Sequence, residues 1–228
     1  SITDTTLPAA VERYSYADTS FEFQHRYTEA CPRLHGSAAT DAYIMFGCSD
    51  GVLAIDLSQS DYPAIKLANP DTLADDSRIG TIFSHAVVSD MVGVAGNQFF
   101  VIDMGNSSDP YQQLSLPAEV SRIAQGFNAS GESFYILGDD GNLYSFNVES
   151  DWAASTPVKV TEAVEEGDIS PVVVVSEVED RLYILDTDGQ KVLEVDSHTL
   201  ASLRTIDLGF KASRLVWLGL SEDSTHDH

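Results

Sequence analysis

A hairpin pattern that recurs four times along the chain constrains its fold more than any other feature. Each copy joins an apolar segment to a second strand through a short turn, at 50–51, 96–97, 140–141 and 179–180. These turns are rich in Asp, Asn and Gly, which tolerate the positive φ that a two-residue hairpin needs. The second strands span 51–57, 97–104, 141–148 and 180–187, so the pattern recurs about every 45 residues, as in propeller blades.

Each copy extends to four strands. A weaker alternating strand follows the hairpin, at 64–67, 113–116, 158–160 and 202–208, and a further short segment precedes it. Four antiparallel strands per repeat make a propeller blade. We therefore predict an all-β fold, a β-propeller of four-stranded antiparallel blades.

The two ends of the chain indicate further strands. Segment 214–220 looks like the opening of another strand, and residues 1–30 hold one or two more. Because a closed four-bladed ring is rare, we expect about four to five blades in a single propeller domain over 1–228, as part of a larger ring whose other blades lie upstream in the same polypeptide. The sequence opens on Ser1 without a Met or a leader, as expected of a processed or truncated product.

The charge is one-sided, with 36 Asp and Glu against 12 Lys and Arg, a net charge of −24 and a pI near 4.2. Such a surface repels phosphate backbones and anionic headgroups, so we expect no nucleic-acid or membrane-surface partner, and it concentrates cations. The simpler interpretation, that acidity serves solubility, stays open. No stretch approaches the roughly 18 apolar residues of a membrane span, so no membrane insertion is expected.

Two cysteines, Cys31 and Cys48, enclose a short loop on segments that can pair as neighbouring strands. This placement favours a disulfide in an oxidising compartment. Free thiols or metal thiolates in a cytosolic protein are the alternative. No Cys-x-x-Cys spacing points to a thiolate zinc site, so the disulfide is the prediction.

Two histidines occupy similar positions in neighbouring repeats. His35 precedes the expected innermost strand 37–40, and His85 precedes the expected innermost strand 86–89. Both are therefore predicted to lie in loops around the mouth of the central channel, where two imidazoles supply half of a tetrahedral zinc shell. A lone loop histidine is more often a structural or solvated residue, and that alternative stays open for each.

Further candidate ligands lie towards the C-terminus. Asp168 belongs to an acidic loop in the fourth repeat, and His226 and His228 belong to a His- and Asp-rich tail at 221–228 that we expect to be flexible. The tail either folds back over the channel, acts as a flexible metal collector, or has no role. His198 is expected to be solvated at an outer turn, and the Asp residues that end several second strands are expected to be turn residues.

Segments 31–36 (Cys-Pro-Arg-Leu-His-Gly), 46–52 (Phe-Gly-Cys-Ser-Asp-Gly-Val) and 82–85 (Ile-Phe-Ser-His) resemble those of the AztD family of periplasmic zinc metallochaperones. The resemblance implies a propeller that holds Zn²⁺ in the periplasm and passes it to the zinc-binding solute receptor of an ABC importer. It also implies that His35 and His85 are zinc ligands, with Asp168, His226 and His228 as weaker candidates.

Two other functions compete with this hypothesis. One is a metal-free propeller that acts as a protein-interaction scaffold. The other is a propeller hydrolase or lactonase with calcium in its channel, which the acidic content allows. The sequence has no Gly-x-Ser-x-Gly elbow, no Gly-rich phosphate loop and no His-Glu-x-x-His motif, so we expect no enzymatic activity.

Overall fold

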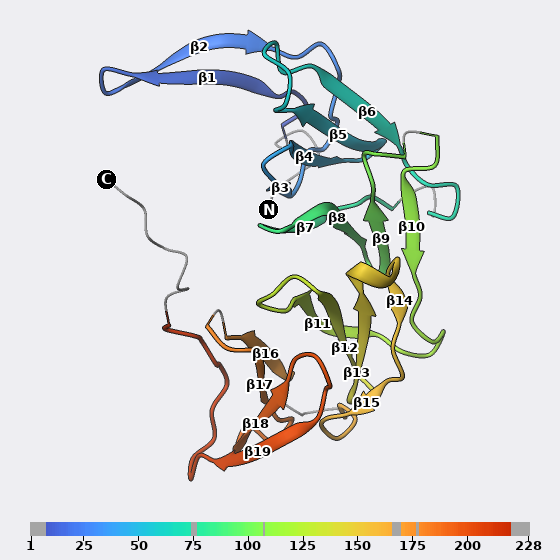
Figure 1. The fold of residues 1–228 in the computed structure, drawn as a ribbon, viewed down its shortest axis with the longest axis vertical. Helices are drawn as coiled ribbons and strands as arrows, with labels where there is room; N and C mark the ends of the chain where they lie inside the picture. The colour runs from blue at the N-terminus through green and yellow to red at the C-terminus, as the bar shows by residue number, and fades with distance from the viewer. Residues whose placement is uncertain (1–7, 74–76, 107, 166–169, 177, 220–228) are drawn as a thin grey trace. The chain divides into compact units, whose positions relative to one another are not determined.

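The computed structural model describes residues 8–73, 77–106, 108–165, 170–176 and 178–219 (Figure 1). The chain divides into two compact units, Ser1–Ser115 and Leu116–His228, and each is described by itself. All sheets are antiparallel, and the described residues contain no α-helix. None of the described segments is therefore a helix long and apolar enough to cross a membrane.

The first unit holds a two-stranded sheet and two four-stranded sheets. The hairpin pairs β1 (Glu12–Ala17) with β2 (Ser20–Arg26). Blade 1 has the order β3 (Ser37–Ala39), β4 (Tyr43–Cys48), β5 (Gly51–Asp56) and β6 (Ala64–Ala68). Blade 2 has the order β7 (Thr81–His85), β8 (Val88–Ala95), β9 (Gln98–Ile102) and β10 (Tyr111–Leu114).

The second unit holds two more blades. Blade 3 begins with β11 (Arg122–Phe127), β12 (Ser133–Gly138) and β13 (Asn142–Asn147), in that order. Its outer strand is in two pieces, β14 (Ala153–Ala154) and β15 (Val158–Lys159), and both pair with β13. A short 3₁₀ turn, η2 (Val148–Ser150), leads from β13 to β14. Blade 4 has the order β16 (Val172–Val175), β17 (Arg181–Leu185), β18 (Lys191–Asp196) and β19 (Ser202–Asp207).

Strand β5 shows why these sequences fold as stacked sheets. All of its residues are buried, and alternate side chains point to opposite faces of a strand. Val52 and Ala54 belong to the cluster that includes Phe100 of blade 2. Leu53 and Ile55 belong to the cluster at the base of the β1–β2 hairpin, together with Val11, Tyr27, Cys31 and Cys48. Blade 1 is thus packed on both faces, which is why its strands read as continuous apolar runs.

The turns are held in a similar way in two blades. Lys66 Nζ on β6 lies 2.5 Å from Asp50 Oδ1 at the β4–β5 turn. Lys159 Nζ on β15 donates to the carbonyl oxygen of Asp140 at the β12–β13 turn, at 2.6 Å. A lysine on the outer strand therefore supports the hairpin turn in both units.

The prediction of an all-β propeller with four-stranded antiparallel blades is confirmed, but the fourth copy of the repeat differs from the other three by one strand. The second strands predicted at 51–57, 97–104 and 141–148 are the third strands of their sheets, whereas Arg181–Leu185 is the second strand of blade 4. The third strand of blade 4, β18, carries Glu194, a charged residue that is nevertheless buried. Glu194 forms ion pairs with Arg181 and Arg204. A charged residue therefore occupies a strand position where the repeat pattern predicts an apolar side chain.

Candidate functional site

The loop before blade 1 is fixed to that blade by covalent and backbone contacts. Cys31 and Cys48 form a buried disulfide with their Cα atoms 4.8 Å apart, as predicted. Ser49 N donates to the Pro32 carbonyl at 2.8 Å, and His35 N donates to the Gly47 carbonyl at 2.9 Å. Loop 31–36 therefore follows the end of β4 closely and holds His35 in place.

Gly36 lets this loop reach the next blade. Its φ is +73°, and a Cβ atom there would overlap the carbonyl oxygen of Gly80, just before β7. The His35 ring uses this close approach, since its Nδ1 lies 2.8 Å from the same carbonyl oxygen. Because a carbonyl oxygen only accepts, His35 Nδ1 carries the hydrogen and donates it.

This contact sets the chemistry of the other ring nitrogen. In the neutral imidazole of His35, Nε2 then holds the lone pair, and the side chain is exposed. Metal-binding histidines are typically oriented in this way, with the non-ligating N–H given to a backbone carbonyl. The His35 ring is thus held in the orientation that such histidines have, just before β3, the first strand of blade 1.

His85 lies in a different place from the one predicted. It ends β7, and Thr81–His85 is itself the first strand of blade 2, so the expected innermost strand at 86–89 is wrong. Ala86 and Val87 form the turn between β7 and β8, despite the β-propensity of Val87. His85 Nδ1 accepts from Val87 N at 3.4 Å, which puts the proton of the neutral ring on Nε2.

The structure does not bring His35 and His85 together. The His35 ring binds Gly80, one residue before β7 begins, whereas His85 is the last residue of that strand. Five residues of extended chain span about 16 Å, far more than one ion can bridge. Within the described ranges, no group of three or more His, Cys, Asp or Glu side chains is placed to hold a metal ion.

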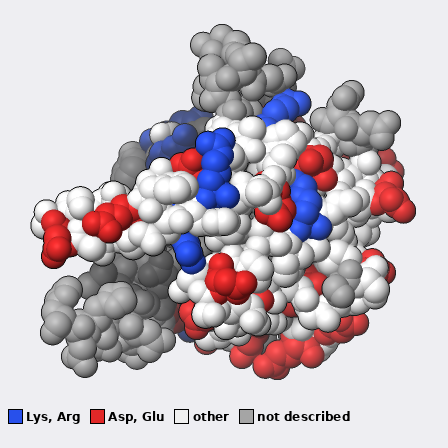
Figure 2. Space-filling view, turned by 90° about the horizontal axis from the view of Figure 1, so that it is seen from above, with Lys and Arg blue, Asp and Glu red and all other residues white. Residues whose placement is uncertain are grey.

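Three of the predicted ligands, Asp168, His226 and His228, lie outside the described residues. The acidic character that was expected to attract cations is visible on the surface. In the view of Figure 2, acidic side chains cover more of the surface than basic ones.

His198 is not simply solvated, as the sequence suggested, but bridges blades 3 and 4. Its Nδ1 lies 2.9 Å from Glu132 Oε2 in the β11–β12 connection, and its Nε2 lies 3.1 Å from Asp180 Oδ2 in the β16–β17 connection. Partial burial disfavours the charged ring, but the hydrogen bond and charge of Asp180, together with the charges of Glu132 and Asp196, outweigh it and raise the pKa of His198 above its usual value. Sequence reasoning missed this site because its three groups come from three distant turns.

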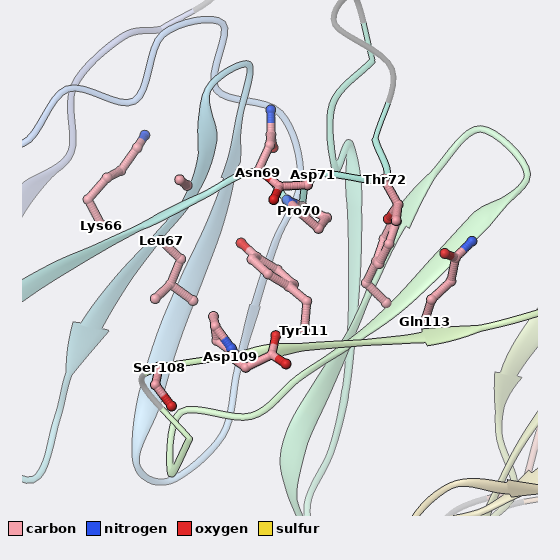
Figure 3. Close-up of a pocket in the computed structure, with 13 residues that line it drawn as sticks. Lys66, Leu67, Asn69, Pro70, Asp71, Thr72, Ser108, Asp109, Tyr111 and Gln113 are labelled. Carbon is pink, nitrogen blue, oxygen red and sulfur yellow. The ribbon is translucent and has the colours of Figure 1, made fainter.

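The sequence also gave no sign of a cavity in the first unit, shown in Figure 3. It has a volume of about 510 Å³ and lies between β6, the chain that follows it, and the start of β10. Figure 3 shows Tyr111 at its centre and Lys66 pointing away from it. The lining residues are Lys66, Leu67, Ala68, Asn69, Pro70, Asp71, Thr72, Phe100, Ser108, Asp109, Pro110, Tyr111 and Gln113.

Comparison with known proteins places this fold. Searches with protein-family models and among curated proteins find no match. Two structures of AztD from Citrobacter koseri superpose on this chain with TM-scores of 0.67 and 0.66, at 21% and 20% sequence identity. The chain has an AztD-like β-propeller fold. Each AztD match covers 82% of this chain and 50% of the other, so this chain spans about half the length of those structures.

A second similar structure is that of Sqt1 from Saccharomyces cerevisiae, with a TM-score of 0.60 at 13% identity, covering 92% of this chain and 61% of the other. The Asp residues that end the predicted second strands are strand-end turn residues, as expected from the sequence. Asp56 Oδ1 accepts from Ser58 N at 2.8 Å, Asp103 Oδ1 from Gly105 N at 2.7 Å and Asp186 Oδ1 from Gln190 N at 3.0 Å.

Proposed function

We propose that this chain belongs to a periplasmic metallochaperone that holds Zn²⁺ and passes it to the zinc-binding solute receptor of an ABC importer. The observation that carries the proposal is the ring of His35, an exposed residue whose Nδ1 is anchored at the Gly80 carbonyl. The AztD-like fold, the Cys31–Cys48 disulfide and the acidic composition support it.

The proposed chemistry is transfer of an ion, not turnover of a substrate. A cargo ion must be exchanged, so its ligands must be few and open to a second protein, and an exposed imidazole meets that need better than a closed thiolate cage. We propose His35 as one ligand of the ion and, separately, Asp168, His226 and His228 as further zinc ligands of this chain. His85, at the other end of β7, is proposed as a ligand of a separate ion.

Zinc competition with a chromogenic chelator tests this function. Roughly one Zn²⁺ per chain is expected at the His35 site, and His35→Ala is expected to lose it because the ligating nitrogen, Nε2, is removed. His25→Ala is the matched control, since His25 is an exposed histidine on β2. Unchanged zinc binding by His35→Ala, or no binding by the native chain at micromolar zinc, would refute the proposal.

Delivery needs a separate measurement. Zinc-loaded chain is mixed with a periplasmic zinc receptor, and the metal content of each protein is followed after separation. Transfer by direct contact accelerates as receptor concentration rises, whereas release into solution followed by rebinding has a rate independent of receptor. A concentration-independent rate would contradict the chaperone role while leaving zinc binding intact.

A metal-free interaction scaffold is the second candidate, and the β1–β2 hairpin favours it. Its Tyr14–Phe23 and Tyr16–Phe21 pairs place four aromatic rings on one face, and these side chains are 48–74% exposed. Contiguous exposed apolar side chains often mark interaction surfaces. A partner that is captured by the native chain with zinc chelated, and lost on Tyr16→Ser with Phe21→Ser, would favour the scaffold.

A further inference from the structure

The wall of the cavity between β6 and β10 has two buried polar atoms whose partners are missing among the residues that the structure describes. Tyr111 Oη and Asn69 Oδ1 are both buried without a hydrogen bond among the described residues. The Asn69 amide nitrogen is used, since it donates to the Ser49 carbonyl at 3.0 Å. Unpartnered buried polar atoms are costly and are uncommon in folded proteins, so two of them in the wall of one cavity point to a guest that supplies hydrogen-bond donors.

The charges around this cavity select a cation. Asp71 lies on the chain that follows β6, and Asp109 lies just before β10, and both carboxylates are exposed at the cavity. The lysine in the lining does not offset them, because Lys66 Nζ is taken by Asp50 Oδ1 at 2.5 Å and the Ala30 carbonyl at 2.9 Å. An anionic guest would therefore meet uncompensated carboxylates within a chain of net charge −24.

The wall also has an aromatic part. The Tyr111 ring packs edge to face on Phe100, with centroids 6.2 Å apart, and Figure 3 shows its hydroxyl directed towards the Leu67–Asn69 side of the cavity. Burial raises the pKa of Tyr111, so its hydroxyl stays protonated and neutral. An aromatic ring beside carboxylates is a common setting for organic ammonium groups, which are attracted to the ring face and donate to oxygen.

We propose that this cavity binds a small organic cation with primary ammonium groups, of the size of a diamine or short polyamine. Its volume of about 510 Å³ is in the ordinary range for small-molecule sites. One ammonium group donates to Asn69 Oδ1 and Tyr111 Oη, and the other pairs with Asp71 or Asp109. This site is independent of His35 and of zinc.

Calorimetric titration of the whole chain with 1,4-diaminobutane at low salt tests the assignment. Butane-1,4-diol and succinate are matched probes with the same carbon skeleton and neutral or negative ends. The diamine is expected to bind, more weakly at high salt, and the other two are not. No diamine binding, equal binding of the diol, or tighter binding of Ca²⁺ would overturn the proposal.

Substitution of the two aspartates tests the contribution of their negative charges to diamine binding. Asp71→Asn with Asp109→Asn is expected to weaken diamine binding by about tenfold or more, because the charged partners are lost. Asp61→Asn, an exposed carboxylate at the opposite end of β6, is the control and should change nothing.

The Tyr111→Phe variant separates a role of the hydroxyl in ligand binding from a role in stability. Because the hydroxyl makes no hydrogen bond to the described part of the chain, its removal should leave the melting temperature of the ligand-free chain unchanged or raised, while diamine affinity falls. Unchanged affinity in this variant would overturn the role of the hydroxyl and with it the geometry proposed for the site.

Discussion

The bridge formed by His198 makes the stability of blades 3 and 4 depend on pH. The folded-state pKa of His198 lies above the ordinary value of 6.5, so the native chain binds this proton more tightly than the unfolded chain does. The stabilisation is therefore complete below pH 6.5 and is lost as pH rises through the higher folded-state pKa. Glu132 and Asp180 must be ionised for the effect, which limits it to mildly acidic and neutral buffers.

The stabilisation by the two His198 ion pairs is limited by the solvent exposure of their side chains. The His198 side chain is 34% exposed and each carboxylate is 47% exposed, so solvent screens both pairs. Screened pairs contribute about 0.2–1 kcal/mol each, which gives about 1 kcal/mol for the two together. In a chain of this length that corresponds to a shift of about 2–4 °C in Tm.

His198→Asn is the perturbation, and Tm by circular dichroism at pH 6 and pH 8.5 is the assay. We expect the variant to lose about 3 °C relative to the native chain at pH 6 and much less at pH 8.5. Glu132→Gln with Asp180→Asn should reproduce the pattern, whereas Glu149→Gln, an exposed acid of the same unit, should not. An equal loss at both pH values would show that His198 acts by packing and refute the reasoning.

Three further predictions concern stability. Replacing Cys31 and Cys48 by Ala should cost about 3 kcal/mol, because the bridge closes a loop of 17 residues, and adding a reductant to the native chain should lower its urea midpoint similarly. Gly51→Ala should cost at least 2 kcal/mol by urea unfolding, about the strain of an outlying backbone, since φ is +142° and the new Cβ would overlap the Leu67 carbonyl. Gly96→Ala should cost only about 1 kcal/mol, because nothing lies within 4 Å of its added Cβ and only its φ of +60° is unfavourable.

The sequence predicted the blades well where the signals are local. An Asp-Gly pair marks the turn after β4 and the turn after β12. The apolar strand and the turn that follows it are each encoded by residues next to one another in the sequence. The fourth blade was misaligned because the burial of Glu194 depends on Arg181 and Arg204, which the chain brings together only when β17, β18 and β19 pair.

The candidate sites were harder to predict for the same physical reason. His85 was placed before a strand because Val87 and Val88 have high β-propensity, and nothing local shows that Ala86 and Val87 form a turn. The anchoring of His35 by Gly80, a contact across 45 residues, also leaves no local pattern. The disulfide was predictable because two cysteines in a short loop leave few alternatives.

The alternation in β5 offers two independent reporters on one strand. A fluorinated or truncated side chain at Leu53 would register the environment beside the hairpin base, while the same change at Ala54 or Val52 would register the environment beside blade 2. If a ligand or a metal disturbs one neighbour of blade 1 alone, adjacent positions a single peptide bond apart will respond differently. Substitutions at neighbouring positions of β5 therefore show which face of blade 1 a bound ligand or metal has disturbed.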